Sequence, residues 1–185
     1  MVEENLDCFQ DFLALKQFSY SCKQLYSADG WCLTGDSGMF LDPLYSPGSD
    51  FIGMNNGFIT DIISKSLAGQ NISVEVKQHE RTFRSIFAGF LPIYEDQYPT
   101  MANSKVMSSK FIWDIMMYWG GIGPLFFKQK LTDLKFMELV RPILSEFFIL
   151  NVRLQNLFRD WATIDDAQKH AGGNFLDYAE IPLLQ

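Results

Sequence analysis

The feature that most constrains the fold is a change of hydrophobic period within residues 30–69, "GWCLTGDSGMFLDPLYSPGSDFIGMNNGFITDIISKSLAG". The apolar run "WCLTG" is too short for a helix and indicates a strand. A turn-rich segment with two prolines follows. After Ser49, apolar residues return at three- and four-residue steps, which predicts a helix. The segment therefore predicts a strand–turn–helix unit.

Two rows of apolar residues give this predicted helix a broad apolar face: Phe51, Met54, Phe58 and Ile62 in one row, and Ile52, Ile59, Ile63 and Leu67 in the other. Ser49 is the predicted N-cap, because its hydroxyl can accept a hydrogen bond from an unpaired backbone N–H. Gly69 is the predicted end of the helix, since glycine tolerates the left-handed conformation found there.

The chain before this unit is strand-like from about Leu13 to Gly35. The runs "FSYSCKQLY" and "WCLTG", separated by the turn signal "SADG", predict two short strands. The chain after Val76 has the helical period almost to its end. The predicted core stripes are Phe83, Ile86, Phe87, Phe90 and Tyr94; Phe111, Ile115, Tyr118 and Trp119; and Leu139, Ile143, Phe147, Leu150, Leu154 and Phe158.

Pro142 lies inside the longest predicted helix, residues 132–161, and is expected to kink or split it. The most apolar stretch, "FIWDIMMYWGGIGPLFF", is interrupted by Asp114, Gly120, Gly121 and Pro124. It is shorter than the roughly 20 apolar residues of a membrane span and indicates a buried helix and a turn. The predicted fold class is α+β, mostly α, with short strands and a strand–turn–helix unit followed by a helical body.

The composition excludes several classes of partner. The 15 basic and 22 acidic residues give a formal charge of -7, so the sequence shows no basic footprint for nucleic acid or an anionic membrane surface. Acidic residues near the amino terminus do not fit a signal peptide. Cys8, Cys22 and Cys32 are odd in number and form no C-x-x-C pair, which favours reduced thiols and a cytoplasmic location.

The turn between strand and helix carries the candidate chemistry. Gly35 allows close backbone approach, and Asp36 presents a carboxylate that can accept hydrogen bonds from a sugar or polyol. The predicted helix start near Ser49 favours an electron-rich or anionic group. The alternative interpretation is an ordinary turn followed by an ordinary helix cap.

The stretch "GWCLTGDSGMFLDPLYSPG" resembles the second flavin-binding motif of FAD-dependent monooxygenases, Gly-Asp followed by six residues and Pro, matched by Gly35, Asp36 and Pro43. It is closer to the motif of flavin-dependent halogenases, whose later positions are matched by Asp42, Pro43, Ser46 and Gly48. The resemblance implies a part of a larger FAD-binding fold: residues 1–69 as the carboxyl-terminal portion of an FAD-binding domain, and residues 70–185 as a helical region on the substrate side.

The same resemblance implies roles for individual residues. Asp36 would bind the ribityl chain of FAD, and the helix start would face the pyrimidine edge of the flavin. The implied cofactor-binding residues are Gly35, Asp36, Asp42, Pro43, Ser46, Pro47 and Gly48. No catalytic residue is assigned. No metal site is expected, because His79 and His170 lie far apart in sequence and His79 is placed on the polar face of a helix.

Two departures from the family limit the inference. The sequence has no G-x-G-x-x-G turn for the FAD pyrophosphate, so an amino-terminal FAD-binding half is expected to complete the protein. Tryptophan halogenases place a catalytic Glu where Tyr45 stands, and bind chloride with backbone N–H groups at the positions of Pro47 and Gly48; proline has no N–H. The sequence therefore favours a monooxygenase-type enzyme acting on a small organic substrate, with a flavin reductase as a further expected partner. The alternatives are a halogenase and a non-catalytic helical interaction module.

Overall fold

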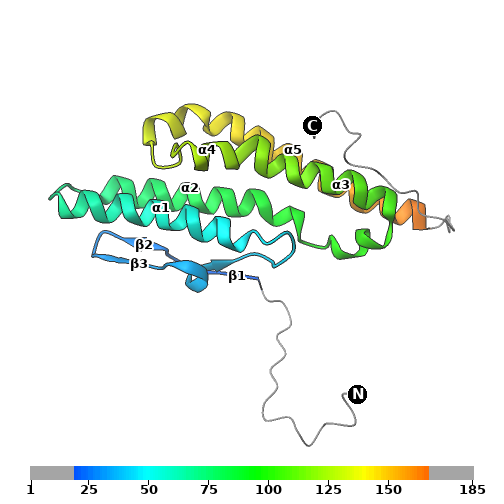
Figure 1. Cartoon of the computed structure of the whole chain (residues 1–185), viewed down its shortest axis with the longest axis horizontal. Helices are drawn as coiled ribbons and strands as arrows, with labels where there is room; N and C mark the ends of the chain where they lie inside the picture. The colour runs from blue at the N-terminus through cyan, green and yellow to red at the C-terminus, as the bar shows by residue number, and fades with distance from the viewer. Residues whose placement is uncertain (1–18, 167–185) are drawn as a thin grey trace, which may run out of the picture.

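The computed structural model describes residues 19–166, which form three layers (Figure 1). Short strands form one outer layer, and the helices form the middle layer and the other outer layer. The strands are β1 (Tyr20–Ser21), β2 (Tyr26–Ser27), β3 (Trp31–Cys32) and β4 (Met39–Phe40). The helices are α1 (Gly48–Leu67), α2 (Ser73–Phe90), α3 (Ser104–Met117), α4 (Gly123–Phe127) and α5 (Leu134–Asp166). The predicted class, α+β and mostly α, is confirmed.

The strands form two antiparallel pairs, β1 with β4 and β2 with β3. The run "FSYSCKQLY" therefore supplies two separate strands, not one, and β4 was not predicted. The break follows from pairing, because Tyr20 lies opposite Phe40 whereas Tyr26 lies opposite Cys32. The turn after β3 thus follows a hairpin, and the described residues contain no parallel sheet with a ligand-binding edge. Residues 13–18 of the predicted strand region lie outside the described residues.

Helix α1 begins at Gly48, within the predicted turn, but its capping residue differs from the prediction. Pro47 occupies the N-cap position, with φ of -71° and ψ of -13° that are already helical. Its hydrocarbon ring has no atom that could accept a hydrogen bond, so the helix has no side-chain cap. The predicted cap at Ser49 is wrong. The other end is confirmed: Gly69 has φ +71°, and the N–H groups of Gly69 and Gln70 donate to the carbonyls of Ser66 and Lys65. This is a Schellman end, which glycine favours.

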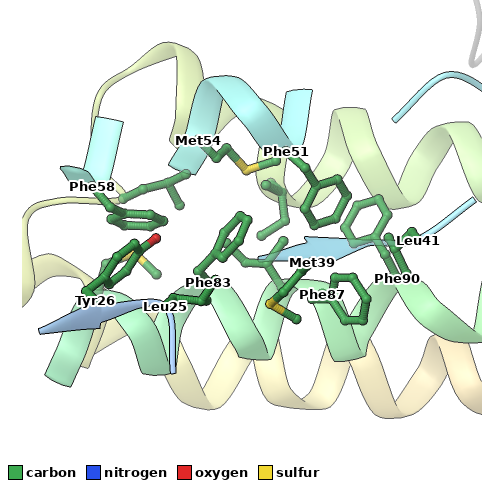
Figure 2. Close-up of a cluster of buried hydrophobic side chains, with 14 of the residues drawn as sticks. Leu25, Tyr26, Met39, Leu41, Phe51, Met54, Phe58, Phe83, Phe87 and Phe90 are labelled. Carbon is green, nitrogen blue, oxygen red and sulfur yellow. The ribbon is translucent and has the colours of Figure 1, made fainter. Parts of the chain in front are cut away.

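The core is one cluster that extends through all three layers, and Figure 2 shows its part between the strands and the α1–α2 pair. The ring of Phe51 makes edge contacts with three rings of α2, at centroid distances of 5.9 Å to Phe83, 6.2 Å to Phe87 and 5.8 Å to Phe90. The first predicted row of α1 and the whole predicted stripe of α2 and Tyr94 are buried. The second predicted row of α1 is only partly buried, since Ile63 and Leu67 are exposed. The core takes residues from both sides of residue 69, and the division into two functional portions stays a prediction.

A π-helical turn, η5 (Tyr118–Ile122), joins α3 to α4. The apolar stretch 111–127 was predicted to be a buried helix and a turn, but it is helical throughout, as the end of α3, η5 and α4, and most of it is half-buried. Among the described residues, no helix combines the length and the apolarity that a membrane span needs. The predicted core stripe of this stretch is only half buried, and Trp119 is exposed. The α3 side chains that are buried in the interior include two charged ones, Lys110 and Asp114.

Helix α5 runs through Pro142 without a break, so the predicted split does not occur. Its core face also differs from the predicted stripe, since Leu139, Ile143 and Leu150 are exposed. The fully buried positions on this helix include the polar pair Asn151 and Gln155. Since α5 is apolar around much of its circumference, the period alone could not show which side faces the core.

Candidate functional site

The Gly-Asp pair lies in a short 3-10 turn, η2 (Gly35–Ser37), two residues after β3. Gly35 has φ +60°, a conformation that side chains rarely adopt, and a Cβ atom there would meet nothing within 4 Å. Glycine is therefore required by the backbone conformation, and the space beside it is open. The Asp36 side chain is exposed, and its backbone carbonyl accepts a hydrogen bond from the Tyr20 hydroxyl.

Two asparagines of α1 hold this turn in place. Asn55 donates to the carbonyl of Leu33 at 3.1 Å, and its oxygen accepts the buried Tyr26 hydroxyl at 2.5 Å. The Thr34 hydroxyl donates to Asn56 at 3.0 Å. Asn56 lies eight residues after Gly48, so the turn sits beside the middle of α1, about 12 Å along the helix axis from its first residue.

Asp42 has a local structural role in this structure. Its Oδ1 atom accepts the backbone N–H of Leu44 at 2.8 Å and the Tyr98 hydroxyl at 2.7 Å. The next turn closes when the N–H of Ser46 donates to the carbonyl of Pro43 at 3.0 Å. Asp42 and Pro43 therefore shape the approach to α1.

Two consecutive residues before α1 have left-handed backbones, Tyr45 at φ 63° and Ser46 at φ 54°. Such conformations cost of order 1 kcal/mol for non-glycine residues and cluster at functional sites. Pro47, which follows, is buried. The ring of Tyr45 lies 5.8 Å from that of Phe111 on α3, so the turn reaches across to the third layer.

A cavity of ≈ 320 Å³ lies at this point, between the turn, the first turn of α1, the end of α2 and the α3–η5 segment. Its walls are mostly aromatic and contain two carboxylates. The lining residues are Tyr45, Pro47, Asp50, Phe90, Ile93, Tyr94, Phe111, Asp114, Ile115, Tyr118 and Trp119. Of the predicted site residues, only Pro47 lines it. Tyr118 and Trp119, which the sequence left open as core or pocket wall, line this cavity.

The first carboxylate of the cavity, Asp50, is in the first turn of α1. Its Oδ1 atom accepts the Tyr118 hydroxyl at 2.9 Å. Burial and this hydrogen bond raise the pKa of Tyr118 to about 12. This hydrogen bond therefore joins the start of α1 to η5, and the phenol of Tyr118 stays neutral.

The second carboxylate, Asp114, is buried. It accepts Lys110 Nζ at 2.5 Å and Gln155 Nε2 at 2.7 Å, and a hydrogen bond with Tyr45 also stabilises its charged form. Burial nevertheless raises the pKa of Asp114 above its ordinary value. A carboxyl group with a raised pKa beside an apolar cavity has the properties of a general acid or base.

Lys110 completes a polar network inside the helical layer. Its ammonium also donates to the carbonyl of Ile93 at 2.9 Å, and burial lowers the pKa of Lys110. Gln155 Nε2 also donates to Asn151 Oδ1 at 3.1 Å. The same oxygen accepts the indole N–H of Trp113 at 2.8 Å. Sequence reasoning missed this network. The sequence did contain a signal for it: Lys110 and Asp114 are four residues apart, the spacing at which side chains meet on a helix, and they lie at the edge of the most apolar stretch.

His79 is fully buried, so its predicted place on a polar helix face is wrong. Its Nε2 atom lies 2.7 Å from Asp61 Oδ2, and this partner makes burial of the ring tolerable. Asp61 also accepts Lys65 at 2.8 Å. Within residues 19–166, no group of three or more side chains is arranged to hold a metal ion. His170 lies outside that range.

Comparisons with known proteins give one distant similarity. No protein-family model matches the chain. No solved structure matches it either. A flavin-dependent halogenase, chlA of Dictyostelium discoideum, is 22% identical over 118 residues, which cover 63% of this chain and 20% of that protein. The chain thus spans about a fifth of that protein's length. This distant similarity to a flavin-dependent enzyme agrees with the resemblance in the sequence and does not separate a monooxygenase from a halogenase.

Proposed function

We propose that this chain is the carboxyl-terminal part of an FAD-dependent oxidoreductase that oxidises a small organic substrate with reduced flavin and oxygen. The observation that carries the proposal is the cavity at the start of α1. Tyr45, one of the two residues with a left-handed backbone before this helix, lines it. The distant similarity to a flavin-dependent halogenase supports the flavin part of the proposal. A flavin reductase, an amino-terminal FAD-binding half and a cytoplasmic location belong to the same proposal.

The residues of the turn fit a flavin. Open space lies beside Gly35 and Gly48, where a Cβ atom would meet nothing within 4 Å. The first turn of α1 has no side-chain cap, so its N–H groups can face an electron-rich ring. Asp36 is exposed and available to the ribityl hydroxyls. When bound, the reduced flavin would supply the electrons for oxygen activation.

The cavity residues would act on the substrate side. The aromatic walls offer an apolar surface for a substrate, and the Tyr118–Asp50 hydrogen bond joins η5 to the helix start beside the cavity. Asp114 would hold or release a proton at its carboxyl group, with Lys110 and Gln155 fixing its orientation. Among the described residues, Asp50 and Asp114 supply the carboxyl groups of this cavity, and burial raises the pKa of Asp114, so Asp114 is our candidate acid–base residue.

Halogenation is the second candidate, because the similar protein is a halogenase. Two observations place it second. Pro47 is buried at the N-cap position without an N–H for a halide, and Tyr45 stands where tryptophan halogenases have a catalytic Glu. A missing charge-assisted hydrogen bond costs on the order of 1.5–3 kcal/mol.

The test uses the 185-residue chain and the longer protein that the proposal implies, in which an amino-terminal FAD-binding half precedes this chain. We expect the chain alone to bind FAD weakly or not at all, and the longer protein to bind it. In the longer protein, Asp36→Ala should weaken FAD binding by about 1–3 kcal/mol. Glu138→Ala, which removes an exposed carboxylate of α5, is the matched control and should leave it unchanged.

Turnover of reduced flavin with a substrate panel, in chloride and in chloride-free buffer, separates the candidates. Chloride-independent oxygenated product supports the monooxygenase. Efficient chlorination by the unaltered protein moves halogenase to first place. A longer protein that binds no flavin contradicts both and leaves the helical interaction module.

A further inference from the structure

Helix α5 carries an apolar seam that the core of its own chain covers only in part: Val140 and Phe147 pack against that core, whereas other positions are exposed. At alternating steps of three and four residues, eight positions are all apolar: Val140, Ile143, Phe147, Leu150, Leu154, Leu157, Trp161 and Ile164. This is the a/d spacing of a coiled coil over more than three heptads, with Val140 at a and Ile143 at d. We call these eight residues the α5 seam.

The d positions of the seam face solvent. Their exposed fractions are 68% for Ile143, 44% for Leu150, 54% for Leu157 and 69% for Ile164. Single exposed apolar residues are ordinary, but a continuous row along one helix marks an interaction surface. The a positions below them are half-buried, so the seam lies at the edge of the core.

The two flanks of the seam differ in character. The e positions on one flank, Leu144, Asn151 and Phe158, are half-buried or buried in the core of the same chain. The g positions on the other flank include Glu146 and Arg153, which are both exposed. Ion pairs across this seam can therefore form only between g positions.

We propose that the α5 seam pairs antiparallel with the α5 seam of a second copy of this chain. In an antiparallel pair g positions face g positions, whereas in a parallel pair g faces e. With Phe147 of one helix level with Leu150 of the other, Glu146 of each copy lies opposite Arg153 of the other. The two-fold axis makes this ion pair twice, as an isologous interface requires. A parallel pair would leave both charges without a partner.

The pairing also fits in length. In this register Val140 lies level with Leu157 and Ile143 with Leu154, so apolar layers continue to Trp161, level with Phe136 of the other copy. The paired segment, residues 136–161, spans about 39 Å of helix. The proposal is independent of the flavin function, since it uses no residue of the cavity.

The test is the oligomeric state of the chain, measured by analytical ultracentrifugation over a concentration series. We expect a dimer whose dissociation constant rises about tenfold in Glu146→Arg and in Arg153→Glu, because each change replaces two ion pairs with two like-charge contacts. The double variant E146R/R153E restores opposite charges and should return close to the unaltered value.

Leu157→Glu should give a monomer, and Leu67→Glu, an exposed apolar residue at the end of α1, is the matched control that stays dimeric. Circular dichroism of each variant checks that it is folded. If the unaltered chain is a monomer, the proposal is overturned, and the seam would then be covered by another part of a longer protein. A dimer that the charge reversals do not weaken overturns the antiparallel register.

Discussion

Lys110 and Asp114 form an ion pair from which water is excluded: Nζ and Oδ2 are 2.5 Å apart, and the two side chains are 0% and 1% exposed. The pair lies four residues apart on α3, with Asp114 on the cavity wall. Buried pairs gain little stability over an apolar pair, because both charges lose their hydration. This one therefore points to a role for the charges beyond stability.

Removing the ammonium should be costly. Lys110→Met leaves the carboxyl group of Asp114 buried without its cation, and we expect the free energy of unfolding to fall by about 3–5 kcal/mol. Urea denaturation measures this. Lys105→Met, at an exposed position on the same helix, should change it by less than about 0.5 kcal/mol. Equal effects of the two variants would contradict a buried charge pair.

The stability should depend on pH through His79. Burial lowers the pKa of His79, and the hydrogen bond from its ring to Asp61 offsets this only in part. The unfolded chain takes up a proton near pH 6.5, while the folded chain does so only at lower pH. The unfolded state thus binds more protons, and the free energy of unfolding falls as the pH drops below about 6.5, by up to about 1.4 kcal/mol per pH unit.

His79→Gln removes this titrating group, so its denaturation midpoints should lose that part of the slope below about pH 6.5. His170→Gln is the control, since it alters the other histidine of the chain and should keep the slope. An unchanged slope in His79→Gln would show that the buried ring titrates normally in the folded chain.

Two helical glycines should respond oppositely to alanine. A Cβ atom at Gly89 would lie 2.4 Å from the ring of Phe148, so Gly89→Ala forces α2 and α5 apart. We expect a loss of about 1–3 kcal/mol. At Gly57, inside α1, a Cβ atom would meet nothing within 4 Å, and Gly57→Ala should gain about 0.5–1 kcal/mol. Thermal unfolding of both variants checks the pair; a stabilised Gly89→Ala would refute the close approach of the two helices.

The left-handed backbone before α1 can be tested in the same way. Ser46 is exposed, so Ser46→Gly removes the conformational cost without losing packing, and we expect a gain of about 1 kcal/mol. Ser49→Gly lies within α1 and should instead lose up to about 1 kcal/mol. Chemical denaturation distinguishes the signs. A loss in Ser46→Gly would mean that the serine side chain holds the turn.

The local part of the fold was predictable from the sequence. The rows through Phe51 and Phe83 repeat at helical spacing and are buried as predicted, and Gly69 ends α1 as expected. These features depend on residues close in the chain. The β1–β4 pairing was not predictable in this way, because Tyr20 and Phe40 are distant in sequence and each strand has only two residues.

The candidate site was predictable only in part. The motif predicted the turn and the helix start, but the cavity wall that contains Asp114 comes from α3, and Asp114 lies more than 60 residues after the turn. On α5, burial of Asn151 and Gln155 depends on partners from other helices, so an apolar pattern favoured their exposed neighbours. The hydrophobic period shows which positions are apolar, but it cannot show which polar side chains find hydrogen-bond partners and become buried.

The π-helical turn η5 has a consequence for insertions and deletions. A π turn accommodates one residue more than an α-helical turn, and here it contains Gly120 and Gly121. Deleting Gly120 would restore the α-helical register and rotate everything after it by about 100°. Phe126 of α4 would then leave its place against Gly53 of α1, although no buried side chain had been changed. At this joint the length of the chain, more than the identity of its residues, determines how the third layer meets the second.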